Sequence, residues 1–306
     1  MDKIILSITA ATLLIGCSRK ENPFFVDKIN PERAELKIVT KQFSGTPPRW
    51  KEIFHEGDEI GLYLLAGDGA HFYTDSILYK NVRAKAVKEA NGNLYWKINP
   101  PIYLTSDPVT LIAYFPYRPQ GHFHPTQLPL SISSISEHTA NYRYGRSTPK
   151  QKRLNSLSPI AHLVLKPALA YLSFRVRLEK KTEKEFHLEA IQIENKTGIT
   201  LSSRKAILEL NTGRITPTPS AVSATRLNTR KVALSSDHYK EYEMKVLPTF
   251  RPAAFGEIQL LFTIDQHTYI TSFPDYTHWK QGYRYVYEII FDGKVFSLKS
   301  LRQASI

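Results

Sequence analysis

The sequence predicts an all-β protein, and three features of its 306 residues favour this class. Apolar and polar residues alternate in several short runs, which is the pattern of strands buried on one face. Turn-forming residues separate these runs. Aromatic residues make up 11% of the chain, and no convincing long amphipathic helix is found beside them. Short strands joined by turns are typical of β-sandwiches, and this length suits about two domains.

The alternating runs occur along the whole chain. The first predicted strand is Ala34–Phe43, in which Leu36 and Ile38 share one face. Further runs, each expected to bury one face, predict strands at residues 109–115, 170–178, 258–264 and 283–291. The segment Ile77–Ala90 has mixed character and is predicted as a short helix or a loop.

Turn signals and irregular stretches divide these runs. Asn91-Gly92 and Asn211-Thr212-Gly213 predict turns, and Asp292-Gly293 predicts a hairpin between Tyr283–Phe291 and Lys294–Leu298. Thr216–Asp237, rich in Ser, Thr and Pro, is predicted as a long loop. A polar, basic stretch near residues 148–157 indicates a domain boundary. The predicted organisation is a signal peptide at 1–16, a lipidated tether at 17–33, an N-terminal sandwich at 34–155 and a C-terminal sandwich at 156–306.

The N-terminus predicts the location of the protein. Lys3 precedes an apolar run, Ile4–Ile15, which is too short to span a bilayer and has the length of a signal-peptide core. The run ends Leu14-Ile15-Gly16-Cys17, which resembles the lipobox of bacterial lipoproteins. That resemblance implies that Cys17, the single cysteine, is lipidated and becomes the first residue of the mature chain. The alternative is a secretory signal cut elsewhere beside an incidental cysteine.

The formal net charge of +13 raises the question of anionic partners. Lys and Arg are scattered along the chain, and no nucleic-acid-binding motif accompanies them. We therefore expect a solvated basic surface and no nucleic-acid partner.

Signals for chemistry are weak. Two S-x-x-K stretches, at Ser147 and Ser202, and Lys196-Thr197-Gly198 resemble motifs of penicillin-binding enzymes, but the required order and spacing are missing. His122 and His124 lack an evident third metal ligand, and a single cysteine cannot build a Cys-based metal site. We expect no catalytic residue, no cofactor and no metal.

Short motifs in a consistent order resemble the fimbrillin-like lipoproteins of Bacteroidota. The stretches that carry the resemblance are Trp50 with Glu56–Tyr63, Trp96 with Val109–Tyr117, Tyr144–Gly145, Ile160–Arg175, Asn211–Ile215, Val246–Pro248 and Trp279–Tyr285. One departure is Ile160, where the family usually has Phe.

The resemblance implies two tandem transthyretin-like β-sandwich domains and a non-enzymatic role. It implies an outer-membrane lipoprotein at the cell surface that forms fimbriae or acts as an accessory adhesin. In polymerising members a protease removes the first strand, and a strand from the next subunit fills the groove. The expected partners are therefore other fimbrial subunits and, through the lipid anchor, the outer membrane.

Three further sites follow from the resemblance. Arg49, and then Lys41, are the candidate maturation cleavage sites, although Arg49 could equally be an ordinary surface arginine. Lys294–Leu301 is the candidate donor strand, the alternative being the last strand of a closed hairpin.

A second interpretation is a lipid-anchored module that binds glycans or proteins of host or bacterial surfaces. Trp50, Trp96 and Trp279 would stack on sugar rings, unless they pack in the core beside their strands.

Overall fold

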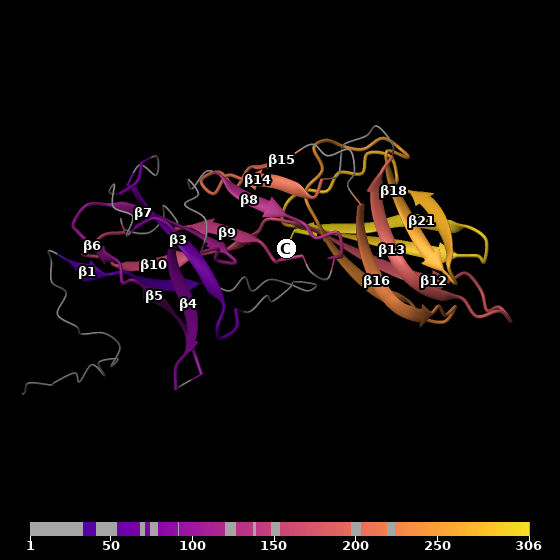
Figure 1. Ribbon diagram of the computed structural model, residues 1–306, viewed down its shortest axis with the longest axis horizontal. Coiled ribbons are helices and arrows are strands. Elements are labelled where there is room, and N and C mark those ends of the chain that lie inside the picture. The colour runs from indigo at the N-terminus through magenta and orange to yellow at the C-terminus, as the bar shows by residue number, and fades with distance from the viewer. Residues whose placement is uncertain are drawn as a thin grey trace, which may run out of the picture.

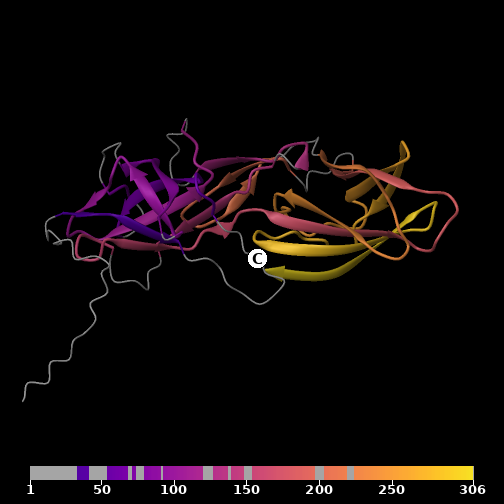
Figure 2. The same cartoon turned by 90° about the horizontal axis from the view of Figure 1, so that it is seen from below.

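The computed structural model describes residues 33–40, 54–67, 71–73, 79–90, 92–119, 127–136, 139–147, 154–196, 203–218 and 224–305. Regular structure in these residues consists of β-strands, which form two sandwiches arranged end to end (Figures 1 and 2). The predicted all-β, two-sandwich fold is confirmed.

The first sandwich contains a six-stranded sheet and a layer of short strands opposite it. The sheet has the order β11-β9-β7-β3-β4-β5. Its strands are β3 (Glu59–Ala66), β4 (Val82–Lys88), β5 (Leu94–Asn99), β7 (Val109–Phe115), β9 (Arg143–Arg146) and β11 (Lys166–Pro167). The opposite layer contains β1 (Ala34–Glu35), β2 (Lys37–Thr40), β6 (Tyr103–Leu104) and β10 (Ile160–Leu163). Both layers contribute side chains to one apolar core.

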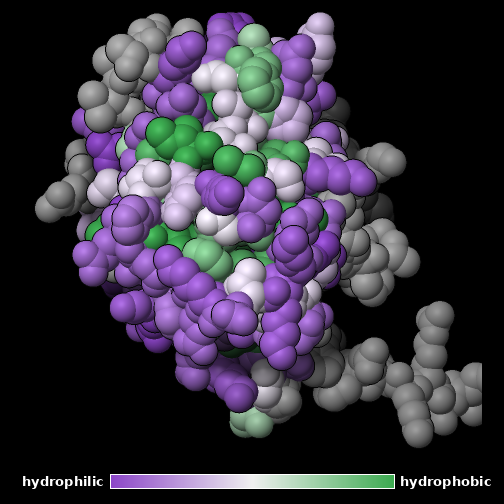
Figure 3. Space-filling model, turned by 90° about the vertical axis from the view of Figure 1, so that its right-hand side faces the viewer, coloured by the Kyte–Doolittle hydropathy of each residue, from purple (hydrophilic) through white to green (hydrophobic). Residues whose placement is uncertain are grey.

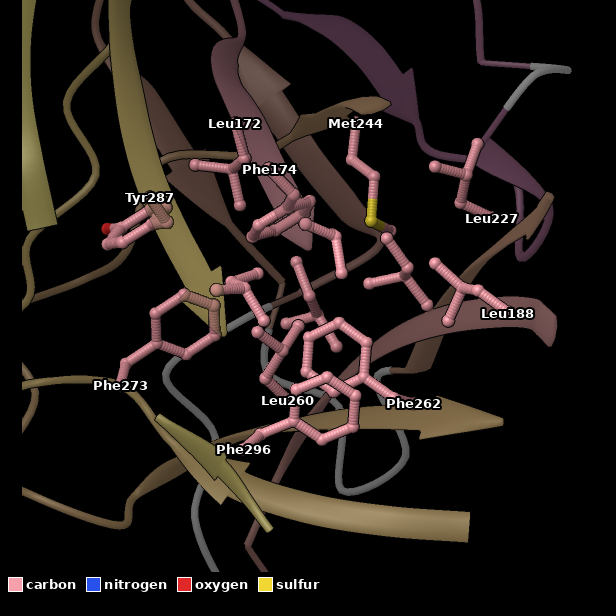
Figure 4. Close-up of a cluster of buried hydrophobic side chains, with 14 of the residues drawn as sticks. Leu172, Phe174, Leu188, Leu227, Met244, Leu260, Phe262, Phe273, Tyr287 and Phe296 are labelled. Carbon is pink, nitrogen blue, oxygen red and sulfur yellow. The ribbon is translucent and has the colours of Figure 1, made fainter. Parts of the chain in front are cut away.

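The second sandwich consists of two four-stranded sheets. One has the order β17-β12-β20-β21 and the other β16-β13-β18-β19. The strands are β12 (Ala170–Leu178), β13 (His187–Asn195), β16 (Ala224–Ala233), β17 (Lys240–Val246), β18 (Ile258–Ile264), β19 (His267–Ser272), β20 (Tyr283–Phe291) and β21 (Phe296–Ser305). Leu172, Phe174, Leu260, Phe262 and Tyr287 project into the space between the sheets (Figure 4).

A third, smaller sheet joins the two halves of the chain. It has the order β15-β14-β8, with β8 (Leu128–Ser131), β14 (Lys205–Leu208) and β15 (Ile215–Pro217). Residues of β8 precede the second sandwich in the sequence, whereas β14 and β15 lie between its strands β13 and β16. Their apolar side chains share a separate core with Tyr63, Ile112 and Leu247. The two sandwiches are therefore connected by hydrogen-bonded strands as well as by the chain.

This bridging sheet changes one prediction. The run 109–115 was expected to bury one face, yet both faces of β7 are buried. Leu111 and Ala113 pack in the core of the first sandwich, whereas Ile112 and Tyr114 pack in the core beneath the bridging sheet. The one-face prediction was wrong here because a second layer covers the outer face of the six-stranded sheet.

Two segments predicted as irregular contain strands. The described part of Ile77–Ala90 includes β4, in which Val82, Ala84 and Ala86 face the core. The predicted loop Thr216–Asp237 includes β16, a ten-residue strand. Its inward positions include Thr225, Leu227 and Thr229, all buried, so threonine replaces the apolar residues that would have shown the alternation.

The predicted hairpin at Asp292-Gly293 is confirmed. Asp292 Oδ1 accepts hydrogen bonds from the N–H groups of Lys294 (2.7 Å) and Val295 (2.8 Å), and Gly293 has a φ of 100°. Because φ is positive, glycine is the favoured residue at this turn. The second strand, β21, extends to Ser305, beyond the predicted end at Leu298.

The predicted domain boundary at residues 155 and 156 stays a prediction. The strands directly after it, β10 and β11, pair with β2 and β9 of the first sandwich.

Seen from the right-hand end of the view in Figure 1, the molecule shows hydrophobic groups between mainly hydrophilic ones (Figure 3). Within the part of the chain that the structure describes, no helix is long and apolar enough to cross a membrane.

Candidate functional site

The described N-terminal segment, residues 33–40, is inserted between two strands of the first sandwich. The Leu36 N–H donates to the carbonyl oxygen of Ile102 (2.8 Å), and the Lys37 N–H donates to that of Pro159 (2.9 Å). Since successive N–H groups of a strand point to opposite edges, the segment is bonded on both edges. On one edge β1 pairs antiparallel with β6, and on the other β2 pairs parallel with β10. We call the position between β6 and β10 the insertion site.

Side chains of the N-terminal segment alternate between the core and the surface. Leu36 is 2% exposed and Ile38 is 6% exposed, whereas Val39 is 45% exposed. The predicted alternation is therefore confirmed. Burial of a leucine or isoleucine contributes about 1.5–3 kcal/mol, so two side chains provide much of the segment's hydrophobic stabilisation.

The end of the segment contacts the edge of the six-stranded sheet. Trp96 Nε1–H donates to the Thr40 hydroxyl (3.3 Å). The Trp96 ring also packs edge to face against Phe54, with ring centroids 5.1 Å apart. Phe54 in turn contacts Phe115 at 5.6 Å. An aromatic cluster therefore lies where the segment leaves the insertion site.

The insertion site has consequences for any state that lacks the segment. Among the described strands, β6 pairs only with β1, and β10 pairs only with β2. Without the segment, backbone groups of both strands would lose their partners, and the buried Ile102, Ala161 and Leu163 would be exposed. Unpaired strand edges and uncovered apolar side chains are both unfavourable. The chemistry of the site therefore selects an extended strand with alternating apolar side chains.

The candidate donor strand is paired within its own sandwich. β21 pairs antiparallel with β20 from Phe296 opposite Phe291 to Ser305 opposite Tyr283. Phe296 is buried and stacks on Phe262 and Phe291, with centroid distances of 4.0 and 4.5 Å. Leu298 packs against the same core. Donation of this strand would first require these contacts to break.

Several motif glycines are required by close packing. A Cβ on Gly61 would lie 2.1 Å from the ring of Tyr114, and one on Gly145 would lie 2.2 Å from the Val164 carbonyl oxygen. Tyr114 O–H donates to Asn81 Oδ1 (2.6 Å), and burial raises the pKa of Tyr114 to about 12. These motif positions hold the six-stranded sheet together.

A network around Arg118 was not predicted from the sequence. Its guanidinium donates to the Pro129 carbonyl oxygen (2.7 Å) and to the Tyr142 hydroxyl (2.5 Å). Asn81 Nδ2–H donates to the Arg118 carbonyl oxygen (2.9 Å). Arg118 thus ties the loop after β7 to β8. A lone arginine in a loop has no local signal that could have identified it.

The predicted processing sites lie outside the described residues. This applies to Cys17, Lys41 and Arg49, and also to Trp50. Trp96 and Trp279 are 8% and 0% exposed, so neither offers a free ring face for stacking on a sugar. Within the described ranges, no group of three or more His, Cys, Asp or Glu residues is arranged to hold a metal ion.

Together these features define a tandem β-sandwich protein whose N-terminal segment fills a position in the first sandwich. The chain belongs to the fimbrillin-like family, whose profile matches residues 44–302. The resemblance identified from the short motifs is therefore confirmed. No curated protein matches the chain.

Solved structures share the fold at low sequence identity. A candidate cell adhesion protein from Bacteroides uniformis has a TM-score of 0.66 and 16% identity, over 89% of this chain and 97% of that one. A candidate cell adhesion protein from Bacteroides ovatus has a TM-score of 0.62 and 12% identity, with the same coverage of both chains. A fimbrial protein from Bacteroides vulgatus has a TM-score of 0.57 and 11% identity, over 89% and 99%.

Proposed function

We propose that the protein is a lipid-anchored fimbrial subunit in which residues 33–40 are replaced by a strand from a neighbouring subunit. Membership of the fimbrillin-like family supports a fimbrial role and a cell-surface location. The observation that carries the exchange is the hydrogen bonding of the segment on both edges, with Leu36 and Ile38 buried. The partners are other fimbrial subunits, and the protein acts by assembly in place of catalysis.

The insertion site favours replacement of residues 33–40 by another strand over loss of this segment without replacement. An extended strand from another subunit would restore the backbone bonds to β6 and β10, and its alternating side chains would refill the core. The resident segment is short, so its intramolecular bonds can be replaced by a longer incoming strand. Lys294–Leu301 is the candidate donor, in line with its alternating apolar residues.

Release of the resident segment requires a cut after it. Arg49 and Lys41 both follow Thr40, the last residue of β2, in the sequence. We propose Arg49 as the preferred cleavage site and Lys41 as the second candidate.

A maturation experiment tests this proposal. Purified protein is treated with an arginine-specific protease, and the new N-terminus and the size distribution are measured. Cleavage after Arg49 followed by a ladder of polymers is expected, and Arg49→Gln should abolish both. Arg33→Gln, in the segment itself, is the matched control and should polymerise normally. Surface material that begins only at Cys17 would contradict maturation by this cut.

The anchor is tested separately. Cys17 is proposed to carry the acyl chains, because two or more chains hold a protein on a membrane where one does not. Cells grown with a clickable fatty acid should label the protein, and Cys17→Ser should remove the label. Label that survives this substitution would contradict lipidation at Cys17.

A further inference from the structure

Strand β19 of the second sandwich differs from the other edge strands of that sandwich. Among the described residues, β18 is its only hydrogen-bonded neighbour, although β21 of the opposite sheet lies close to it. Its sequence, His267-Thr268-Tyr269-Ile270-Thr271-Ser272, contains no Lys, Arg, Asp, Glu or Pro. Ile270 is 59% exposed. Uncharged, β-branched edge strands of this kind are templates for pairing with another strand.

The other three edges carry features that oppose such pairing. β21 has a register shift opposite Val286 and Tyr287, and it contains Lys299. β17 has four charged residues among seven, and two of them, Glu241 and Glu243, form ion pairs with Arg175 and Arg284. Bulges and charges are the usual devices that protect edges.

The fourth edge, β16, is both charged and partly covered. It contains Arg226, Arg230 and Lys231, and the Arg226 N–H donates to the Ser134 carbonyl oxygen (2.8 Å). In a chain of net charge +13, pairing two copies through β16 would bring like charges together. Among the four edge strands, β19 is therefore the one without Lys, Arg, Asp, Glu or Pro.

Two exposed aromatic residues lie at the Ser272 end of β19. Phe255 is 72% exposed and Tyr276 is 80% exposed. Both of their backbone N–H groups donate to Asp275 Oδ1, at 3.2 and 3.1 Å, so the backbones of these two residues, on different loops, are held close together. Tyr276 has a φ of 60°, which lies in the left-handed region that favours glycine.

The first of these loops is also fixed next to the strand. Glu257 receives two bonds from the Arg251 guanidinium, at 2.7 and 2.8 Å, and a third from the Ala254 N–H. A Cβ on Gly256 would lie 3.7 Å from the Ser272 hydroxyl. The aromatic pair is therefore exposed and pre-organised beside the free edge.

We propose that β19 pairs antiparallel with β19 of a second copy of this chain, joining two second sandwiches edge to edge. A two-fold contact brings the same surface of both copies together, so it must avoid like charges, and the uncharged β19 does so. Antiparallel pairing places the Ser272 end of one copy beside the His267 end of the other. Phe255 and Tyr276 would then cover the turn at Asp265 and Gln266 of the second copy.

Cysteine crosslinking tests the contact in the full chain. In a Cys17→Ser background, Ile270→Cys and Thr268→Cys are oxidised alone and as a mixture. These residues share the outer face, so one of the three samples should give a disulfide-linked dimer. Val295→Cys, equally exposed at 63% but in the β20–β21 turn, is the matched control and should remain monomeric.

Sedimentation equilibrium tests the energetics. Ile270→Lys should weaken dimerisation at least about tenfold, because it would add one positive charge from each copy to the contact. Ile270→Thr keeps an uncharged β-branched residue and should retain the dimer. A monomer at all concentrations, a dimer unaffected by Ile270→Lys, or a monomer that binds only a foreign peptide strand would each overturn the proposal. Strand exchange in the first sandwich is independent of these results, because β19 takes no part in it.

Discussion

The N-terminal segment of the first sandwich and strand β20 of the second are both inner strands, but they are held very differently. The segment at 33–40 pairs over two residues with β6 and over four with β10. β20 pairs over eight residues with β12 and nine with β21. The segment buries Leu36 and Ile38, whereas β20 buries Tyr285, Val286, Tyr287, Ile289 and Phe291. The N-terminal segment is therefore held by fewer paired residues and fewer buried side chains than β20.

The largest expected loss of stability comes from a substitution in the core of the second sandwich. Trp279 is fully buried, and its Nε1–H donates to the Tyr287 hydroxyl (2.9 Å). Trp279→Ala should lower the free energy of unfolding by about 3–5 kcal/mol, because it leaves a large cavity and removes one hydrogen bond of the Tyr287 hydroxyl. Urea denaturation followed by fluorescence measures this. Trp279→Phe, which keeps the ring contact with Phe273, should cost less; equal losses would show that packing around the ring is unimportant.

The next effect should be local to the N-terminal segment. Leu36→Ala removes one of its two buried side chains and should cost about 2–3 kcal/mol. We expect faster hydrogen exchange at the amide of Lys37 by roughly thirtyfold or more, with the amides of β20 unchanged. Val39→Ala, at an exposed position, is the control. If β20 amides accelerate equally, the segment is part of one global unit and the contrast between the sandwiches fails.

A smaller effect should come from the bridge between the halves. Gly213 has a φ of 75°, and an added Cβ would lie 2.3 Å from the Tyr144 hydroxyl oxygen. Gly213→Ala should therefore destabilise the protein by about 2 kcal/mol, partly by strain and partly by this clash. Gly92 has a similar φ of 86°, but the atom nearest to an added Cβ, Lys88 Cε, is 3.9 Å away. Gly92→Ala should therefore destabilise the protein by about 1 kcal/mol.

A double-mutant cycle separates the two contributions at Gly213. Adding Tyr144→Ala to Gly213→Ala should remove the clash with the Tyr144 ring but leave the backbone strain at residue 213. Additive effects in the cycle would mean that β14 and β15 do not press on β9, and that the two sandwiches are joined less tightly than the contacts indicate.

The smallest effect concerns pH at the aromatic loop. The Arg251 guanidinium and the Ala254 N–H lower the pKa of Glu257 to about 2. A carboxylate with a lowered pKa contributes stability above its ordinary pKa, and this contribution is lost as pH falls toward about 2. NMR titration should show the Glu257 carboxyl protonating near pH 2, and Arg251→Gln should move this upward. Protonation near pH 4.5 in the unmodified chain would contradict the ion pair.

Local alternation predicted burial correctly for strands that have only one face covered by other elements. Ile258–Ile264 alternates as expected, because it has one apolar face toward the sandwich core. Ala170–Leu178 alternates only in its second half, because Tyr171 packs in the core beneath the bridging sheet and Ser173 is also buried. β16 was missed because threonines occupy two of its inward positions, and β4 because its only apolar residues are alanines and valines. The family motifs correctly identified the fimbrillin-like family. One of their glycines, Gly61, is required because an added Cβ would clash with the ring of Tyr114.

The sequence by itself determined the all-β class, the turn at Asp292-Gly293 and the alternation of the N-terminal segment, because these depend on residues close together in the chain. Only the tertiary structure decided that the segment lies between β6 and β10, that β14 and β15 cover the first sandwich, and that β19 forms an edge of its sheet. These features join residues far apart in the sequence, such as Lys37 with Ile160. Their selection depends on which apolar faces and strand edges can be covered together, and local periodicity carries no information about that.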